Sequence, residues 1–413
     1  MMPQKTNFKE IFLLICGGIT TGVLIGEIGL RILGIDGYPK IDKNTDVSPT
    51  IFHTANPDRG WSLKPNAAGW WEDDEGKSYV EINSDGFRDR ERSQQKPPNT
   101  FRIAVLGDSF AEAIHIPLEK TFWGILEQDL KQCKIPNEPT FEVLNFGIHG
   151  YGTAQQLMTL RTKVWEYNPD FVILAFFVGN DIINNSQDLE FDHYRPFFIY
   201  DDQDQLVADM SFREITPGYS NRYGFSWVDR LPAFLVNNSR IFRLLKKLNL
   251  EQNKQRFSDE FTKLSGQNYQ EPTDDVWKQA WRVTEDLILL MRDEVIEKNA
   301  GFFLFTIGDP NQVHRNATRR QDYMTQNGIT NFFYPEERLQ KFSQENGINI
   351  LTLAQPFQEY AEKHQICLHG SEESLPCLGH WNLEGHRLAG QMISSKMCEI
   401  LQSPAPSSST LQN

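Results

Sequence analysis

The chain has 413 residues, of which 39% are hydrophobic and 23% charged, and its 41 basic against 55 acidic residues give a formal net charge of −14. This composition supports a large folded core and excludes a globally disordered chain. The negative charge and the lack of a dense basic patch argue against nucleic acid as a partner. None of the five cysteines has CxxC spacing, so neither a zinc knuckle nor a thioredoxin-like site is predicted, and we expect no cofactor.

The first predicted element is an N-terminal membrane anchor. No residue from Ile11 to Gly26 carries a charge, and the apolar stretch resumes after Glu27. A bilayer span needs roughly 20 apolar residues, so the stretch qualifies if Glu27 lies near the interface. Lysines precede the stretch, and no clear small-x-small cleavage site precedes Glu27 at its other end. We therefore expect a cytoplasmic leader at 1–10 and an uncleaved transmembrane signal anchor at 11–34, with the rest outside the cytoplasm. A cleaved signal peptide is the alternative.

Apolar runs that alternate with amphipathic stretches predict an α/β domain with a parallel sheet covered by helices on both faces. The predicted strands are 101–106, 141–146, 171–177, 302–307 and 348–353, and the predicted helices are 122–132, 153–167, 275–298 and 383–401. The domain organisation expected from these elements is an N-terminal extension at 35–100, a catalytic domain at 101–402 and a disordered tail at 403–413.

One connection in this domain, at about 184–272, is far longer than an ordinary link between a strand and a helix. It follows the third predicted strand, and its segments RPFFIY and LVADM, separated by DDQDQ, predict a β-hairpin. We expect this insertion to cover the active-site cleft and to shape specificity.

Polar residues follow the predicted strands at the points where the strands end. Ser109 comes after the first strand, Gly147 after the second and Asn180 after the third, while His380 lies on the loop between the fifth strand and the last helix. Because sites in open parallel sheets form at the carboxyl ends of the strands, we expect these four residues to meet at one edge.

These residue types are the ones that ester cleavage requires. A serine hydroxyl becomes a strong nucleophile when an imidazole takes its proton, which assigns Ser109 as nucleophile and His380 as general base. The developing oxyanion needs preorganised donors. The backbone N–H groups of Ser109 and Gly147 and the side-chain amide of Asn180 are the predicted donors.

The segments LGDSF, NFGIHGYG, VGND and GHWNLEGH resemble, in order, the four blocks of the SGNH/GDSL hydrolases. The resemblance implies a flavodoxin-like three-layer α/β/α fold with a five-stranded parallel sheet. It implies the same roles for Ser109, Gly147, Asn180 and His380. Together with the anchor, the segments GWSLKPN and INSDGFRDRE look like exported bacterial members of this class.

The fourth block departs from the family pattern in the acid that orients the histidine. The family has an aspartate three, or sometimes two, residues before the histidine, where this chain has Cys377 and Leu378. We therefore expect a Ser109–His380 dyad in which a backbone carbonyl holds the imidazole. The alternative acids are Glu373, in the first place, and Glu372 and Glu384.

Cys367 and Cys377 bracket a short loop that leads to His380. In an exported domain we expect them to form a disulfide, which would restrict the unfolded chain by ~2–3 kcal/mol and hold the approach to His380. Two buried free thiols are the alternative.

Several neighbours of the blocks have structural interpretations. Asp108 and Asp181 are expected to stabilise their turns, and His386 to be satisfied locally within a helix. His115 and His149 follow the first two blocks and are candidates for the cleft. For Trp61, Trp70 and Trp71, packing against the domain is favoured over stacking on sugar rings.

The function predicted from the sequence is that of a serine esterase acting on an acyl ester, for example an acylated glycan or lipid. An O-acyltransferase that modifies an exported polysaccharide would use the same residues, and a non-catalytic SGNH-like binding protein would fit the missing acid. A metallophosphoesterase is disfavoured because its metal ligands are absent: no Asp-x-His precedes Gly107, and Asp181 rather than a histidine follows Asn180.

Overall fold

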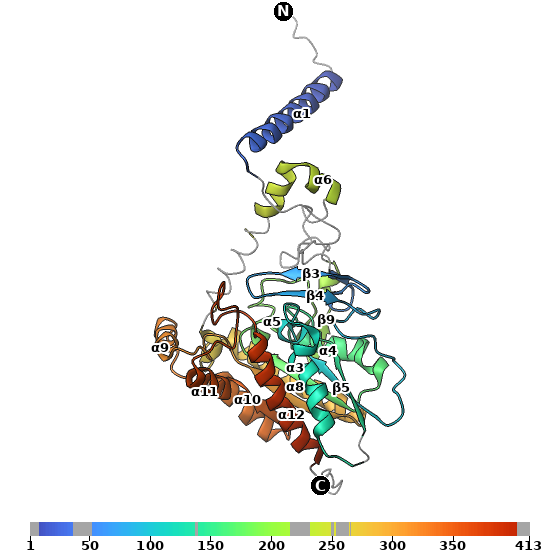
Figure 1. The fold of residues 1–413 in the computed structure, drawn as a ribbon, viewed down its shortest axis with the longest axis vertical. Helices are drawn as coiled ribbons and strands as arrows, with labels where there is room; N and C mark the ends of the chain where they lie inside the picture. The colour runs from blue at the N-terminus through green and yellow to red at the C-terminus, as the bar shows by residue number, and fades with distance from the viewer. Residues whose placement is uncertain are drawn as a thin grey trace, which may run out of the picture. The chain divides into compact units, whose positions relative to one another are not determined.

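The computed structural model describes residues 8–35, 52–136, 139–214, 232–248, 252, 264 and 266–402. The chain divides into two compact units (Figure 1). The first unit comprises Met1–Asp46 and Pro217–Phe261, and the second comprises Val47–Thr216 and Thr262–Asn413.

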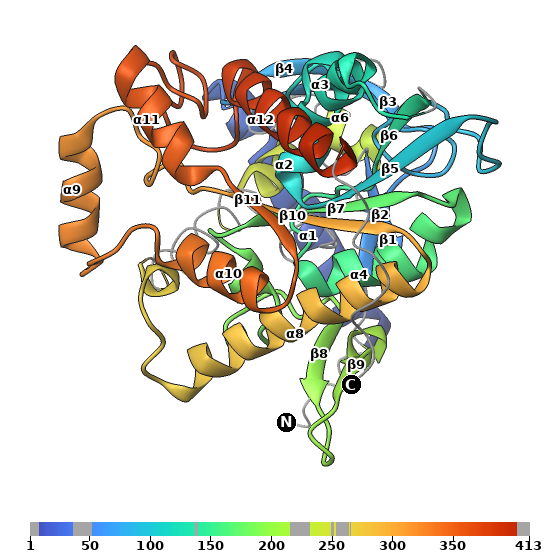
Figure 2. The ribbon, with the colours of Figure 1, turned by 90° about the horizontal axis from the view of Figure 1, so that it is seen from below.

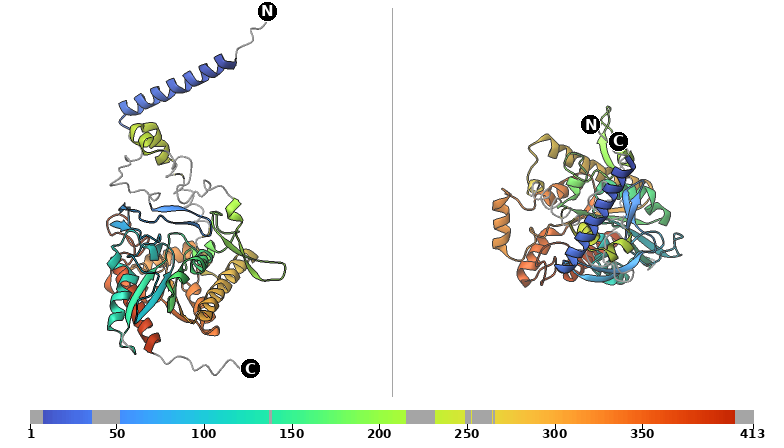
Figure 3. Two further views of the ribbon diagram at one scale, coloured as in Figure 1. Left: turned by 90° about the vertical axis from the view of Figure 1, so that its right-hand side faces the viewer. Right: turned by 90° about the horizontal axis from the view of Figure 1, so that it is seen from above.

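The first unit contains the predicted anchor as helix α1 (Phe8–Ile32). Its segment Ile11–Ile32 has a mean hydropathy of 2.0 and is not buried, and α1 is the one helix among the described residues that is long and apolar enough to cross a bilayer. The unit also contains α6 (Ala233–Asn238) and a helix at 240–248, which lie beside the C-terminal end of α1 (Figures 1 and 3).

The second unit is built on a five-stranded parallel sheet, as predicted. The strands are β5 (Thr100–Leu106), β6 (Thr140–Asn145), β7 (Phe171–Phe177), β10 (Gly301–Ile307) and β11 (Asn349–Thr352). Their order in the sheet is β11-β10-β7-β5-β6, and every neighbouring pair is parallel. In chain order this is 2-1-3-4-5, the flavodoxin-like arrangement.

Helices cover both faces of the sheet (Figure 2). One layer contains α3 (Phe122–Asp129), α11 (Ala354–His364) and α12 (Leu383–Gln402), and the other contains α4 (Thr153–Thr162), α8 (Asp275–Glu297) and α10 (Tyr334–Glu345). The remaining helices are α2 (Ser109–Glu112), α5 (Asp181–Asn184) and α9 (Ala317–Gln326). Short 3₁₀ helices are η2 (Leu118–Lys120), η3 (Leu130–Gln132), η4 (Val164–Tyr167), η5 (Ser211–Glu214) and η6 (Gln267–Tyr269). Because both faces are covered, six of the seven side chains of β7 are buried, which explains its continuous apolar sequence.

The N-terminal extension supplies two antiparallel pairs to the second unit. Strand β1 (His53–Asn56) pairs with β2 (Gly60–Leu63), and β3 (Ala68–Glu72) pairs with β4 (Lys77–Glu81). Each pair buries part of its surface against the α/β domain. Trp61 in β2 is fully buried, as expected for a packing role, whereas Trp70 in β3 is exposed.

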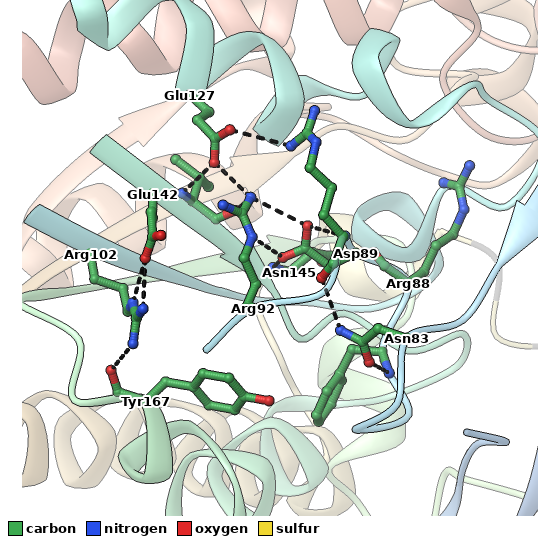
Figure 4. A network of polar contacts seen from close by, with 12 residues as sticks. Asn83, Arg88, Asp89, Arg92, Arg102, Glu127, Glu142, Asn145 and Tyr167 are labelled. Atoms are coloured by element: carbon green, nitrogen blue, oxygen red, sulfur yellow. Dashed lines mark hydrogen bonds and ion pairs between the residues drawn. The ribbon is translucent and has the colours of Figure 1, made fainter. Parts of the chain in front are cut away.

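A polar network fastens this extension to the sheet (Figure 4). The Asp89 carboxylate accepts a hydrogen bond from the backbone N–H of Asn145 at 3.3 Å and lies 3.3 Å from Nε of Arg92. Arg92 in turn donates to Glu127 at 2.7 Å. These residues come from the INSDGFRDRE segment and its continuation, from α3 and from the end of β6, so this segment fixes the extension beside the carboxyl end of the sheet.

The long insertion is divided between the two units. Its predicted hairpin is present in the second unit as β8 (Phe197–Tyr200) and β9 (Leu206–Asp209). The hairpin packs on the α4 and α8 layer, where the Tyr200 hydroxyl donates to Asp286 at 2.5 Å. Residues 217–261 belong to the first unit. That the insertion covers the cleft stays a prediction.

Candidate active site

Ser109 lies where the sequence places it, just beyond the carboxyl end of β5, as the first residue of α2. Asp108 caps this short helix, because its carboxylate accepts the Phe110 N–H at 2.9 Å. The helix also packs closely against the second block. A Cβ atom on Gly147 would lie 2.3 Å from Cβ of Ala111, so only glycine fits there.

Arg88, from the N-terminal extension, holds the other end of this helix. Its buried guanidinium donates to the carbonyl oxygens of Glu112 at 2.7 Å, Ala113 at 2.6 Å and Ile116. Carbonyls at a helix C-terminus lack partners within the helix, and a cation there is electrostatically favourable. Arg88 therefore positions the backbone that carries Ser109.

The side chains of Ser109, His380 and Glu75 form a continuous hydrogen-bonded chain (the relay). His380 Nε2 is 2.7 Å from Ser109 Oγ, and His380 Nδ1 is 2.7 Å from Oε2 of Glu75. The same Glu75 oxygen accepts the backbone N–H of His380 at 3.1 Å. The carboxylate thus contacts both the ring and the backbone of the histidine, which determines the ring orientation and places the proton on Nδ1.

The expectation that a backbone carbonyl orients His380 is therefore wrong, and so is the choice of Glu373 as the next candidate. Glu372 forms an ion pair with Arg315 instead, and Glu384 hydrogen-bonds to Tyr360 and pairs with Arg387. Glu75 lies 305 residues before His380, so no spacing rule within the fourth block leads to it.

Glu75 occupies the turn between β3 and β4, and the turn is held by its own polar contacts. The Asp73 carboxylate accepts the N–H groups of Glu75 at 2.9 Å and Gly76 at 3.0 Å. Gly379, with φ +77°, makes room for the acid, because a Cβ atom there would lie 2.4 Å from Glu75 Oε1. A glycine is therefore required at position 379 for two reasons: the backbone is left-handed there, and the Glu75 carboxylate approaches closely.

The loop that carries His380 is closed by a Cys367–Cys377 disulfide, as predicted. The Gly370 N–H donates to the His380 carbonyl at 2.8 Å. Asn382 caps α12 by accepting two N–H groups at 3.0 Å. A second disulfide joins Cys133 to Cys398. The loop is thus fixed before His380 by the Cys367–Cys377 disulfide and after it by the Asn382 cap.

Loss of the Cys367–Cys377 disulfide is expected to destabilise the fold by ~2–3 kcal/mol and to lower kcat about tenfold, because the loop carrying the base loosens. The double variant Cys367→Ser/Cys377→Ser tests this by denaturant unfolding and ester hydrolysis. The matched control is Cys133→Ser/Cys398→Ser, which should lose stability and keep kcat. Equal loss of kcat in both variants would contradict a specific effect on His380.

The charges of the acid and the base stabilise each other. Burial raises the pKa of Glu75, but the charge and hydrogen bond of His380 outweigh it and lower this pKa to about 2. Burial lowers the pKa of His380, but the Glu75 carboxylate overrides it and raises the pKa to about 9. The Glu75 carboxylate is therefore ionised at neutral pH and favours the protonated form of His380.

Two further histidines lie beside the relay, as the sequence indicated. The His115 ring centroid is 5.7 Å from that of His380, and its Nε2 donates to the Trp381 carbonyl at 2.9 Å. The His149 ring centroid is 6.2 Å from that of His380. His386 is buried in α12 and accepts the Phe122 N–H of α3 through Nδ1 at 3.2 Å, so its partner lies on another helix and not, as expected, within its own.

Asp181 is the first residue of α5 and accepts the Phe177 N–H at 3.0 Å, in keeping with the structural role expected for it. Burial and the nearby Asp108 charge raise the pKa of Asp181 well above its usual value. Burial likewise raises the pKa of Asp108 to about 6. This buried pair supports the turns that carry the first and third blocks.

The predicted oxyanion donors have different surroundings. The Ser109 N–H belongs to the first turn of α2, where backbone donors have no intrahelical acceptor. The Gly147 N–H donates to the side-chain oxygen of Asn145 at 3.0 Å. Asn180 precedes α5, its side chain does not cap that helix, and its Oδ1 is buried without a hydrogen-bond partner among the described residues.

Comparisons with known proteins match no family model and no curated protein. Solved structures similar to this chain include an acetyl xylan esterase, with 15% identity over 73% of this chain and 99% of that protein and a TM-score of 0.34. They also include the lipase/acylhydrolase of Enterococcus faecalis, with 12% identity, 74% and 100% coverage and a TM-score of 0.34. A GDSL-like lipase of Bacteroides thetaiotaomicron has 11% identity, 75% and 91% coverage and a TM-score of 0.33.

The sheet order and the positions of the four blocks are those that the resemblance to the SGNH/GDSL hydrolases implied. The fold is the flavodoxin-like α/β/α arrangement that the sequence predicted.

Proposed function

We propose that this chain is a membrane-anchored serine esterase that hydrolyses an acyl ester outside the cytoplasm. The observation that carries the proposal is the continuous relay Ser109–His380–Glu75, with both junctions at 2.7 Å. A serine with this arrangement is activated for attack on a carbonyl carbon.

In the proposed reaction, Ser109 Oγ attacks the ester carbonyl carbon while its proton moves to Nε2 of His380. The negative Glu75 stabilises the imidazolium that results. The tetrahedral intermediate collapses, the carbon–oxygen bond to the alcohol breaks, and His380 returns the proton to the departing oxygen. Water then attacks the acyl-enzyme with His380 as base, which releases the acid and restores Ser109.

The oxyanion of both tetrahedral intermediates is assigned to the Ser109 N–H, the Asn180 side-chain amide and the Gly147 N–H. To bind the oxyanion, the Gly147 N–H leaves its hydrogen bond with the Asn145 side chain or divides it between the two acceptors. Donors of this kind stabilise the transition state more than the bound ester.

Replacing Asn180 with alanine is expected to slow turnover by about 100- to 1,000-fold with little change in KM, as for the loss of one oxyanion donor. Steady-state kinetics on p-nitrophenyl acetate measure this. Asn184→Ala, on the short helix that follows Asn180, is unsuitable as a control because Asn184 is buried and donates to Glu190. Asn311→Ala, on the loop after β10, is a better one. An effect confined to KM would make Asn180 a substrate-binding residue instead.

Two features support the proposed location. Helix α1 has the length and composition of a bilayer span. The two disulfides of the second unit are of a kind that persists in oxidising compartments and is rare in the cytosol. We therefore place the second unit on the outer side of the membrane, with α1 as its anchor.

Labelling with a fluorophosphonate probe tests the proposal directly. The purified protein should bind the probe covalently, with the adduct located on Ser109 by mass spectrometry, and prior incubation with an ester substrate should slow labelling. The absence of an adduct on folded protein would overturn the assignment and leave an SGNH-like protein without esterase activity.

A further inference from the structure

Glu27, the acidic residue that interrupts the apolar sequence of α1, is fully engaged in the first unit. Its carboxylate accepts the hydroxyl of Ser239 at 3.0 Å, the backbone N–H of Arg240 at 3.0 Å and that of Ile241 at 3.2 Å. These N–H groups open the helix at 240–248 and have no acceptor within it. Glu27 therefore caps the helix from a different element, and its charge lies at the favourable end of the helix dipole.

The contact is reciprocal. Arg240 donates to the carbonyl oxygen of Leu30 at 2.9 Å and to that of Arg31 at 3.4 Å, at the C-terminal end of α1. Arg31 donates to the Asn238 carbonyl at 3.2 Å, at the end of α6. Each element thus satisfies terminal backbone groups of the other, so 232–248 is docked on the end of α1 by charged side chains of both partners.

The helix at 240–248 exposes two leucines and buries two of its basic side chains, while Lys247 is exposed on another face. Leu245 and Leu248 are 37% and 45% exposed, whereas Arg243 and Lys246 are only 9% and 5% exposed. Phe234 of α6 is 73% exposed. A helix on the surface of a soluble domain turns its apolar stripe inward and its charged residues outward. The reversed pattern fits an apolar medium outside.

The exposed stripe continues the surface of the anchor. Ile241, Leu245 and Leu248 are spaced four and three residues apart and so share one face of the helix. On this face, Cδ1 of Ile241 lies 3.3 Å from the position of a Cβ atom on Gly26 of α1. The face that touches the candidate span is thus the face that bears the exposed leucines.

We propose that residues 232–248 form a membrane-interface segment whose Phe234, Leu245 and Leu248 insert into the outer interfacial layer of a phospholipid bilayer, beside the point where α1 leaves it. The proposal rests on the membrane anchorage proposed above. The stretch 240–248 has four basic residues and no acidic one. Basic side chains are attracted to the phosphates of the lipid headgroups, which lie at the depth proposed for this segment.

The segment also gives a reason for the length of the insertion. The chain passes between the two units near residues 46–47, 216–217 and 261–262. The catalytic unit is therefore joined to the membrane unit by three stretches of chain, and the long insertion returns to the anchor to provide two of them.

Spin-label depth measurements test the proposal on the full-length protein in vesicles of phosphatidylcholine and phosphatidylglycerol. Cys16 is the free cysteine among the described residues and lies within α1. In a Cys16→Ala background, Phe234→Cys, Leu245→Cys and Leu248→Cys provide three labelling sites. Lys247→Cys on the other face of the same helix and Ser395→Cys on α12 are the matched controls.

The three apolar positions should collide with oxygen more often than with a water-soluble nickel complex and report depths of about 5–10 Å below the headgroups. The two controls should show the reverse. Labels at all three positions that are as accessible to nickel as Ser395→Cys would overturn the proposal. So would labels shielded from both reagents, which would indicate a protein partner or a second copy.

Labelling of the native Cys16 separates this proposal from the anchorage on which it rests. If Cys16 reports lipid while the three apolar positions report water, the anchor stands and the interface segment is refuted. If Cys16 reports water and alkaline carbonate strips the protein from the vesicles, the anchorage itself is refuted, and the interface segment with it.

Discussion

Alanine at position 109 is expected to lower kcat for p-nitrophenyl acetate by about 10⁴-fold or more while leaving the unfolding curve unchanged. The side chain is small and half-buried, and its hydroxyl hydrogen-bonds to His380, so its removal creates no large cavity. Residual catalysis from oxyanion donors and binding would remain.

Ser395→Ala is the matched control, because its hydroxyl hydrogen-bonds within α12, away from the relay. This variant should keep full activity. If Ser109→Ala retained more than roughly a tenth of the wild-type turnover, a different nucleophile or an activated water would have to carry the reaction.

The second large effect is expected for Glu75→Gln, with a fall in kcat of about 10³- to 10⁴-fold and little change in KM. Glutamine preserves the shape of the side chain but removes the charge that stabilises the imidazolium. Its amide N–H₂ can also face Nδ1 and favour the tautomer with the proton on Nε2, which cannot accept the proton of Ser109. Ester kinetics and circular dichroism measure activity and folding together.

The pH dependence supplies a second readout. The reactive form needs neutral His380, and Glu75 raises the pKa of this histidine to about 9. The acid limb of the kcat/KM profile should therefore lie above the value of a free imidazole. Glu75→Gln removes the stabilisation of the cation, so the limb should move to lower pH even as the maximum rate falls.

Glu372→Gln and Glu373→Gln are the controls for this variant, and each should change kcat less than about tenfold, because neither residue holds His380. A larger loss in either of them than in Glu75→Gln would transfer the role of the acid. An unshifted acid limb in Glu75→Gln would mean that the carboxylate does not set the pKa of the base.

The local pattern of the sequence was enough to predict the sheet and much of the site. Short runs rich in apolar residues marked all five strands, and the run of β7 is uninterrupted because this strand is buried on both faces. Ser109 and His380 were predictable for a related reason. Each lies just beyond a strand or just before a helix, where the topology of an open sheet gathers side chains at one edge. The Cys367–Cys377 disulfide was predictable because the loop between the two cysteines is short.

Other parts were decided only by tertiary packing. Glu75 and Arg88 lie in an extension with no long-range periodicity, and they reach the site because polar contacts fasten that extension beside the sheet (Figure 4). Contacts across about 300 residues leave no trace in local spacing. Glu27, in the first unit, is another residue whose partners only the tertiary structure shows. In the sequence it interrupts a span, and only its bonds to the helix at 240–248 reveal that it is a cap. Apolar and turn patterns are local, so the sequence alone shows which segments form buried strands, helices or turns. The partner of a single charged side chain is different, because it is whichever distant segment the completed fold brings within hydrogen-bond distance.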